Sequence, residues 1–400
     1  MKWVLHVLSV LTAVMCSCNK PENSDVSGNQ SGAGQVPDNF IILAWSDIIS
    51  ASDAEWKLQK MVEAGFNTYL GWFDTLAEVD MLLSAADKVG IGIITDSPEL
   101  RADPKKAVAV MNGHESLFGY HIDDEPEVSE FSLLATRIKS IETYDKAHQC
   151  YVNLYPNWAW GGEDVYLSRV RAFLKNVPVE FLSFDNYPVK TVDGVSTVRP
   201  DWYHNIEDIR TAARESGIPF WGFALALSHK TPEASYPVPT IGELRLQQFS
   251  NLVYGAVGFQ YFTTWGFIQN SGVVENVYNK VKQVNAELLS MESLFLGADV
   301  SDVWHTGAVI PTGTSRLTSL PVGVAALETS AVGAVVSYFV KDGRYYLAVV
   351  NKDCNSDMDL RISFSADAMV SDDHNMSWRA VGQSAAEYKI SAGDIILFSL

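Results

Sequence analysis

Residues 117–126 read LFGYHIDDEP, an apolar run that ends abruptly in three adjacent carboxylates and a proline. The proline disfavours a helix at Glu125 and stops the strand pattern. From Val128 onward the apolar residues recur at helical spacing. The segment therefore predicts a short apolar strand, an acidic turn and then a helix.

The acidic turn is a first candidate for chemistry. Three neighbouring carboxylates repel one another, which raises the pKa of at least one of them toward the neutral range that a general acid needs. A solvated acidic loop, or a helix N-terminus that favours negative charge, would have the same composition. The rest of the chain is needed to choose between these interpretations.

The alternation of strand and helix continues from residue 40 to about residue 292. Apolar strand-like runs occupy residues 40–45, 67–72, 91–95, 117–122, 149–154, 180–184, 219–225 and 257–262. Amphipathic stretches lie between them, for example at 52–64, 76–88, 128–144, 201–215 and 241–254. Eight such units predict an α/β fold, a (β/α)₈ TIM barrel over residues 40–292. A doubly wound open sheet is the alternative, but it rarely has eight such even units.

The last hundred residues have a different pattern. Residues 334–339 and 345–350 are strand-like and are joined through Asp342-Gly343, which predicts a β-hairpin. Further short strands follow at 360–364, 376–380, 388–390 and 395–400, with no helix of any length. We expect a small all-β sandwich over residues 300–400.

The N-terminus has the form of an export signal. A basic residue and an apolar run over residues 3–15 precede Cys18, and this run is too short to span a bilayer well. The segment resembles a bacterial lipoprotein signal peptide over residues 1–18, except that Met15 stands where Leu is usual. A Ser/Gly/Asn/Gln-rich tether over residues 19–39 would follow the lipidated cysteine. The predicted location is the bacterial cell envelope, periplasmic or surface-exposed, with a plain secreted protein as the alternative.

Composition narrows the possible partners. The net charge of −19 argues against nucleic acid and anionic membrane surfaces, so membrane contact is expected only through the lipid anchor. No G-x-G-x-x-G follows the first strand, and we expect no cofactor. The 8 His form no H-x-H or H-x-x-E pair at the strand ends, so we expect no metal. Past the signal only Cys150 and Cys354 remain, which excludes a disulfide framework.

In a (β/α)₈ barrel, chemistry takes place at the C-terminal ends of the strands. There the sequence carries carboxylates, which transfer protons and bind hydroxyls, and aromatic side chains, which stack on sugar rings. Any one of these residues could instead be a helix cap or a loop residue, but together they predict a carbohydrate substrate. The candidates are Asp47, Asp74, Asp124, Glu125, Asn153, Tyr155, Trp158, Asp185, Tyr187 and Trp265.

The barrel region resembles the clan A glycoside hydrolases, including the family 42 β-galactosidase type. In that family a strand-4 motif ends in Asn-Glu-Pro and its Glu is the acid/base. Residues 124–126 stand at this position, with Asp124 in place of Asn, so the resemblance implies Glu125 as the proton donor. Residues 183–188 (SFDNYP) resemble a D-x-Y-P motif of such barrels, and 243–265 resemble their last helix and strand.

The chain departs from the clan at strand 7, where the family has its nucleophilic Glu. Residues 220–228 (FWGFALALS) contain no carboxylate. Asp185 is the first candidate for the second catalytic carboxylate, and Asp74 is the next. Glu233 and Glu243 are weaker candidates, because Glu243 at a helix start is better explained as a cap.

These features predict a surface-anchored glycoside hydrolase that uses Glu125 as general acid and Asp185 as the second carboxylate. The alternative is a catalytically silent carbohydrate-binding lipoprotein whose barrel has lost its nucleophile. A metal-dependent barrel enzyme has less support, for the reasons given above. No G-x-S-x-G motif indicates a serine hydrolase.

Overall fold

The computed structural model describes residues 37–45, 50, 53–231 and 234–400. The predicted signal peptide, most of the tether, Cys18, Asp47 and Glu233 lie outside this part of the chain. None of the helices in the described part is long and apolar enough to cross a membrane.

Eight parallel strands close into a barrel, in the order β1-β12-β9-β6-β5-β4-β3-β2. These strands are β1 (Ile41–Trp45), β2 (Thr68–Trp72), β3 (Gly92–Asp96), β4 (Leu117–Asp124), β5 (Gln149–Leu154), β6 (Leu182–Phe184), β9 (Phe220–Leu225) and β12 (Gly258–Phe262). Each overlaps one of the eight predicted runs, and the (β/α)₈ fold is confirmed. Short apolar runs alternating with stretches of helical spacing carried enough information to predict it.

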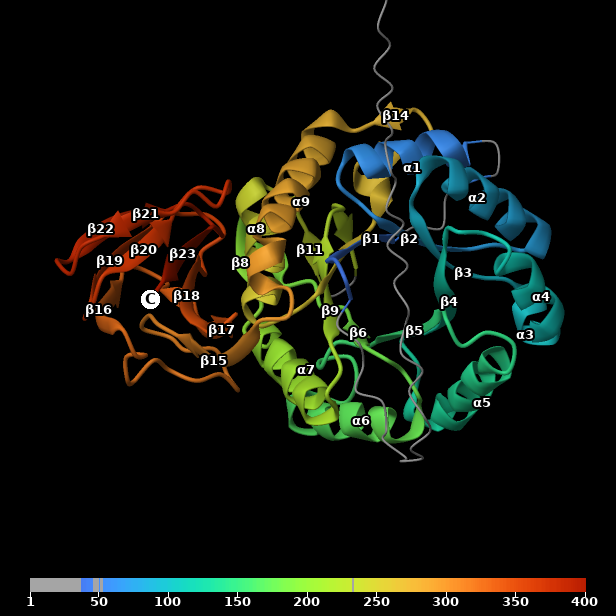
Figure 1. The fold of residues 1–400 in the computed structure, drawn as a ribbon, viewed down its shortest axis with the longest axis horizontal. Coiled ribbons are helices and arrows are strands. Elements are labelled where there is room, and N and C mark those ends of the chain that lie inside the picture. The colour runs from blue at the N-terminus through green and yellow to red at the C-terminus, as the bar shows by residue number, and fades with distance from the viewer. Residues whose placement is uncertain (1–36, 46–49, 51–52, 232–233) are drawn as a thin grey trace, which may run out of the picture. The chain divides into compact units, whose positions relative to one another are not determined.

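The helices lie outside the strands and cover the barrel (Figure 1). They are α1 (Ala54–Glu63), α2 (Leu76–Val89), α3 (Pro98–Ala102), α4 (Pro104–Met111), α5 (Phe131–Glu142), α6 (Glu163–Asn176), α7 (Trp202–Ser216), α8 (Ile241–Val253) and α9 (Glu275–Phe295). Helix α2 illustrates how the sequence sets their bounds. Thr75 and Glu78 form a capping box at its start, and Gly90 ends it with a left-handed φ of 77°. The cap is therefore Thr75, and its neighbour Asp74 is exposed.

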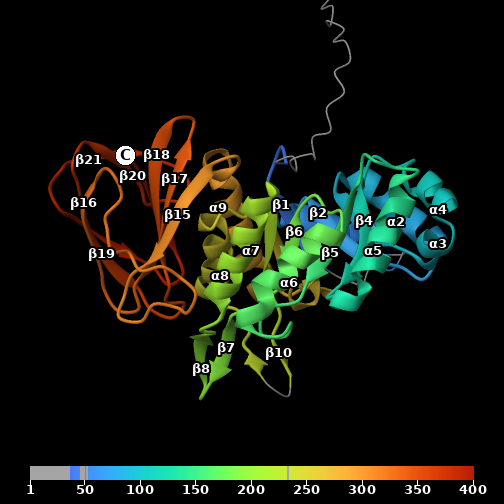
Figure 2. The same cartoon turned by 90° about the horizontal axis from the view of Figure 1, so that it is seen from below.

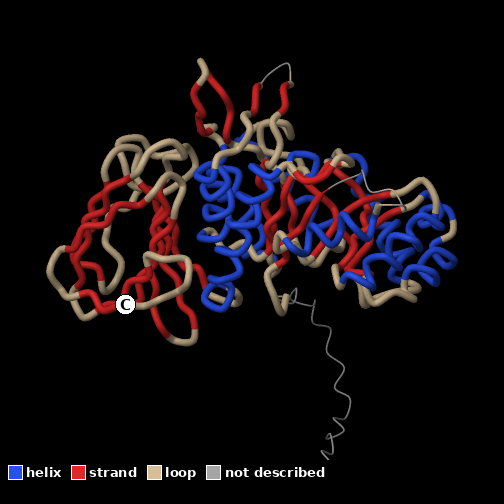
Figure 3. The backbone as a smooth tube through the Cα atoms, turned by 90° about the horizontal axis from the view of Figure 1, so that it is seen from above, coloured by secondary structure: helices blue, strands red, loops and turns tan. Residues whose placement is uncertain are grey.

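Small hairpins are inserted where the chain leaves the barrel strands. Strands β7 (Val189–Val192) and β8 (Val195–Val198) follow β6, and β10 (His229–Lys230) and β11 (Ser235–Tyr236) follow β9. Figures 2 and 3 show both hairpins projecting from the same face of the molecule. Because each follows the C-terminal end of a parallel strand, this face is the one where a barrel carries its chemistry.

The C-terminal region forms two antiparallel sheets, as expected for a sandwich. One has the order β15-β17-β18-β23-β20-β21 and the other the order β16-β19-β22. Their strands are β15 (Asp299–His305), β16 (Val324–Thr329), β17 (Ala334–Lys341), β18 (Arg344–Asn351), β19 (Met358–Phe364), β20 (Ala368–Ser371), β21 (Arg379–Val381), β22 (Ala386–Ile390) and β23 (Ile395–Ser399). The predicted β17–β18 hairpin is present, and its turn residues Asp342 and Gly343 have φ of 50° and 75°.

Helices α8 and α9 face the sandwich (Figure 1). Arg245 on α8 donates to both carboxylate oxygens of Glu287 on α9, and its Nη1 donates to Asp394 Oδ2 at 2.9 Å. Phe295 and Phe339 pack across the same boundary with ring centroids 4.6 Å apart. The boundary therefore combines an apolar core with a nearly buried charge network.

Candidate active site

A β-bulge decides which acidic side chains face the barrel interior. Strand β4 pairs with β5 in regular register up to His121, skips Ile122, and then aligns Asp124 with Asn153. Side chains alternate between the two faces of a strand, so an unbroken ladder would place Asp123 on the inner face. The extra residue at Ile122 instead turns Asp124 inward.

Glu125 lies directly after the bulged strand in an uncommon backbone conformation. Its φ of 54° is in the left-handed region, which costs about 1–2 kcal/mol for a residue with a Cβ atom. Its N–H donates to the carbonyl oxygen of Asn153 at 2.9 Å, which ties the turn to β5. Backbone strain of this kind is concentrated at functional sites. The turn brings Glu125 beside Asp124 instead of on the opposite side of the strand.

A cavity of about 260 Å³ lies at the C-terminal ends of the strands, and both carboxylates line it. Its lining residues are Trp45, Asp124, Glu125, Asn153, Asp185, Tyr187, Phe223, His229 and Phe262. Acidic groups from β4 and from the end of β6 thus meet among aromatic rings. Polar groups converging in a largely aromatic pocket are the usual form of a small-molecule site.

The three carboxyl groups perturb one another. Burial, and then the negative charge of Asp124, raise the pKa of Glu125 to about 7, while a hydrogen bond with Asp185 opposes the rise. Burial raises the pKa of Asp185 well above its usual range, and the charges of Glu125 and Asp124 add to this. Asp124 is exposed to the cavity, but surrounding protein still raises its pKa through partial desolvation. One carboxyl of this group can therefore hold a proton near neutral pH.

A buried hydrogen-bond network lies behind the carboxylates. Asn153 Nδ2 donates to Asp124 Oδ1 at 3.1 Å and to Asp185 Oδ1 at 3.0 Å, and its Oδ1 accepts from Ser183 Oγ at 2.9 Å. Ser183 in turn accepts from Gln260 Nε2 at 2.9 Å. The sequence analysis missed Ser183 and Gln260. Their signal was a polar residue at an inward position of an otherwise apolar strand.

The aromatic wall contains a neutral histidine. Trp45 lines the cavity and packs against Trp72, His121 and Phe223 with ring centroids 5.7–5.8 Å apart. Burial lowers the pKa of His121 to about 4, so its ring is neutral at physiological pH. His121 is therefore a buried residue of the barrel core. His229, by contrast, lines the cavity.

The structure brings together five of the ten predicted site residues: Asp124, Glu125, Asn153, Asp185 and Tyr187. Four others lie away from the lining of this cavity: Asp74, Tyr155, Trp158 and Trp265. Trp158 is 51% exposed and stacks under Arg199, whose guanidinium carbon is 4.8 Å from the ring centroid. Tyr155 is half-buried, and burial, followed by the charge of Glu125, raises its pKa. Asp47 lies outside the described residues.

Other carboxylates near the strand ends have structural partners. Asp96, at the end of β3, forms an ion pair with Arg137 at 2.8 Å. Glu243 closes a capping box with Thr240 at the start of α8, as expected for a cap. Of the described residues predicted as the second catalytic carboxylate, Asp185 lines the cavity with Glu125, whereas Asp74 and Glu243 do not. Among the described residues, no group of three or more His, Cys, Asp or Glu is arranged to hold a metal ion.

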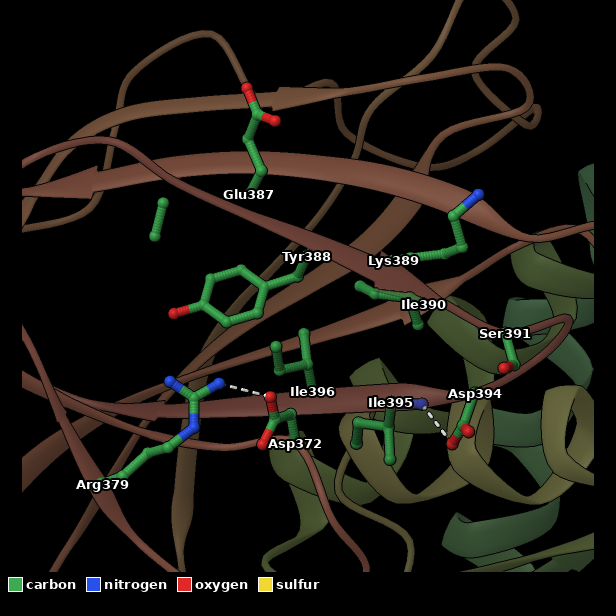
Figure 4. A pocket seen from close by; sticks show the side chains of 11 residues that line it. Asp372, Arg379, Glu387, Tyr388, Lys389, Ile390, Ser391, Asp394, Ile395 and Ile396 are labelled. Carbon is green, nitrogen blue, oxygen red and sulfur yellow. Dashed lines mark hydrogen bonds and ion pairs between the residues drawn. The ribbon is translucent and has the colours of Figure 1, made fainter.

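A larger cavity, of about 430 Å³, lies on the sandwich (Figure 4). Three of its charged groups are already engaged: Arg379 pairs with Asp372, and the Asp394 carboxylate accepts from the N–H of Ile395 at 2.8 Å. Volume alone therefore does not locate the site. The carboxyl groups of the barrel cavity form no ion pair with the described residues, and they shift one another's pKa values, as is typical of catalytic sites.

No family model matches the sequence, and no curated protein matches it. Solved structures do resemble it. A family 39 glycoside hydrolase from the gut symbiont Bacteroides cellulosilyticus WH2 superposes with a TM-score of 0.52 at 10% identity, over 90% of this chain and 81% of that chain. A GH27 β-L-arabinopyranosidase from Geobacillus stearothermophilus gives a TM-score of 0.51 at 10% identity, over 90% and 96% of the two chains. The chain therefore shares its fold with glycoside hydrolases.

Proposed function

We propose that the protein is a glycoside hydrolase in which Glu125 is the general acid and Asp185 is the nucleophile. The observation that carries the proposal is the position of the two carboxyl groups. They come from different strands, line one cavity and lie within hydrogen-bonding reach of each other. The shared fold with glycoside hydrolases supports a carbohydrate substrate.

The reaction would proceed in two steps. Glu125 gives its proton to the glycosidic oxygen while Asp185 attacks the anomeric carbon, so that the C–O bond to the leaving group breaks and a glycosyl ester forms. Glu125, now a carboxylate, accepts a proton from water as that water attacks the ester. Asp185 leaves as a carboxylate, and the enzyme returns to its starting state.

The spacing of the two groups predicts the stereochemistry. Retaining glycosidases have carboxyl groups about 5–5.5 Å apart, whereas inverting enzymes separate them by about 6.5–9.5 Å to admit a water. The hydrogen bond between Glu125 and Asp185 favours the shorter of these two spacings. We expect the first product to keep the anomeric configuration of the substrate.

The silent-barrel alternative depended on the missing carboxylate of strand 7. That strand is β9, and it is indeed without a carboxylate. Asp185, at the end of β6, lines the cavity and could take its place. This removes the main reason for preferring a barrel without activity.

The proposal includes anchoring of the protein in the cell envelope through a lipid on Cys18. The sequence signal described above is its support. Mass analysis of the N-terminus of the natural protein tests it. A diacylglycerol-modified Cys18 is expected, and an unmodified terminus after signal cleavage would overturn the anchor but not the enzymatic proposal.

The experiment for the enzymatic proposal is a screen of the purified protein on aryl glycosides and polysaccharides. On any substrate that is cleaved, Glu125→Gln should lower kcat by about 10²–10⁴ with little change in KM. Glu115→Gln is the matched control, because Glu115 is exposed and precedes β4 at the opposite end of the barrel. Full turnover in Glu125→Gln would refute the role given to this residue.

A further inference from the structure

One side-chain nitrogen lies between two of the three carboxyl groups of the cavity. Asn153 Nδ2 carries two hydrogens, and one points to Asp124 while the other points to Asp185. We propose that Asn153 determines which carboxyl carries the proton: it holds Asp124 and Asp185 as carboxylates and leaves the proton on Glu125. The proposal deepens the proposed function, on which its effect on turnover rests.

The orientation of the Asn153 amide is fixed from behind. Its Oδ1 accepts from Ser183 Oγ, and Ser183 itself is held by Gln260 Nε2 and contacts Tyr151 OH at 2.8 Å. Tyr151 donates onward to Gln260 Oε1 at 2.6 Å. A flipped amide would point Oδ1 at two carboxylates, acceptor against acceptor. The network therefore keeps the two N–H groups aimed at the acidic residues.

The location of the proton follows from counting donors. A carboxyl group that accepts a hydrogen bond from an N–H is stabilised in its charged form. Asp124 and Asp185 each receive such a bond from Asn153. No N–H group of the described residues donates to the Glu125 side chain, whose hydrogen-bond partner is the carboxyl group of Asp185. Burial raises the pKa of Asp185 as it does that of Glu125, but the hydrogen bond from Asn153 opposes the rise at Asp185 and has no counterpart at Glu125. Three adjacent carboxylates cannot all ionise easily, so we place the proton on the one without an N–H donor.

This distribution of protons gives Glu125 and Asp185 their catalytic roles before the substrate binds. Glu125 is ready to donate, and Asp185 is charged and ready to attack. Asn153 is then a positioning residue and not the substrate contact that the sequence predicted, because both of its N–H groups are already used. Its substitution should change the distribution of protons as well as the rate.

Isotope-edited infrared spectroscopy at pH 6 tests the proton location without requiring activity. The parent should show the C=O band of a protonated carboxyl, and Glu125→Gln should lack this band. In the parent, the band should shift when the glutamate carboxyls carry ¹³C. It should not shift when the aspartate carboxyls carry ¹³C. In Asn153→Leu, a new protonated band that shifts with ¹³C-aspartate should appear. Asn285→Leu is the control, because this buried Asn donates to the backbone oxygen of Ala64 and not to a carboxylate.

A band in the parent that shifts with labelled aspartate would overturn the proposal, as would an Asn153→Leu spectrum equal to that of Asn285→Leu. If Asn153→Leu does not fold, Ser183→Ala removes the donor that orients the amide and should give the same aspartate band at lower intensity. An unchanged spectrum in Ser183→Ala would then overturn the proposal.

Kinetics give a second, separable readout. Loss of two hydrogen bonds to charged groups should move the acidic limb of the kcat profile of Asn153→Leu upward by about one to two pH units. We expect kcat to fall by about 10–100-fold while KM changes little, since no substrate contact is removed. A raised KM with an unmoved limb would contradict the positioning role. Absence of glycosidase activity in the parent, with the infrared result intact, would overturn only the proposed function.

Discussion

Replacing Glu125 with Gln should stabilise the folded protein at alkaline pH while lowering its activity. The folded pKa of Glu125 is about 7, against 4.5 for the ordinary side chain. The unfolded chain therefore binds fewer protons than the folded chain between these two values, and Glu125 lowers stability increasingly as the pH rises through this window. The full difference corresponds to about 3 kcal/mol, and solvent screening of this partly open group reduces it to about 2 kcal/mol.

Gln removes the charge and can still hydrogen-bond to Asp185, so this destabilisation should disappear. At pH 8 the variant should unfold about 2–3 °C above the parent, or at a correspondingly higher urea concentration. Near pH 4.5 the two proteins should differ by only a few tenths of a kcal/mol. Equal stability gaps at both pH values, or a less stable variant at pH 8, would show that Glu125 is not held at an unfavourable charge.

Three further substitutions test other contacts in the structure. Asp185→Asn should reduce turnover at least as severely as Glu125→Gln. Partial recovery of turnover with a small anionic nucleophile such as azide would identify Asp185 as the attacking group. Recovery in which the anomeric configuration of the product does not change would contradict this role. Arg245→Met leaves the nearly buried Glu287 without its guanidinium partner, although Gln283 still donates to it, and should cost about 3–5 kcal/mol in denaturant unfolding. A loss below about 1 kcal/mol would contradict the importance of that pair. Gly119→Ala would bring a Cβ within 2.6 Å of the carbonyl oxygen of Gln149, and thermal unfolding should show a loss of about 1–3 kcal/mol.

The barrel was predictable because apolar residues at strand and helix spacing mark each unit separately. Short insertions were not predicted. The β7–β8 hairpin has only four residues in each strand, and the sequence analysis recorded no element there. The sandwich strand β15 was missed because its Asp and Ser residues interrupt the apolar pattern.

The sequence predicted which residues lie at the site, but it did not predict the hydrogen bonds between them. Strand-end reasoning selected Asp124, Glu125 and Asp185, since the C-terminal ends of parallel strands meet on one rim. It could not tell that Asp124 and not Asp123 faces inward, because the bulge at Ile122 has no signature in the sequence. Hydrogen bonds between distant strands likewise depend on the closed barrel.

The carboxyl groups of the cavity and the hairpins beside it belong to different parts of the chain. The carboxylates are fixed by strand register, whereas the hairpins β7–β8 and β10–β11 are additions to the loops after β6 and β9. Tyr187 and Tyr236, at the bases of these hairpins, have ring centroids 6.5 Å apart. Exchange of either hairpin can therefore change which molecules reach the cavity without moving the strands. Under the proposed function, such a division allows mutation to explore new substrates while the catalytic groups are kept.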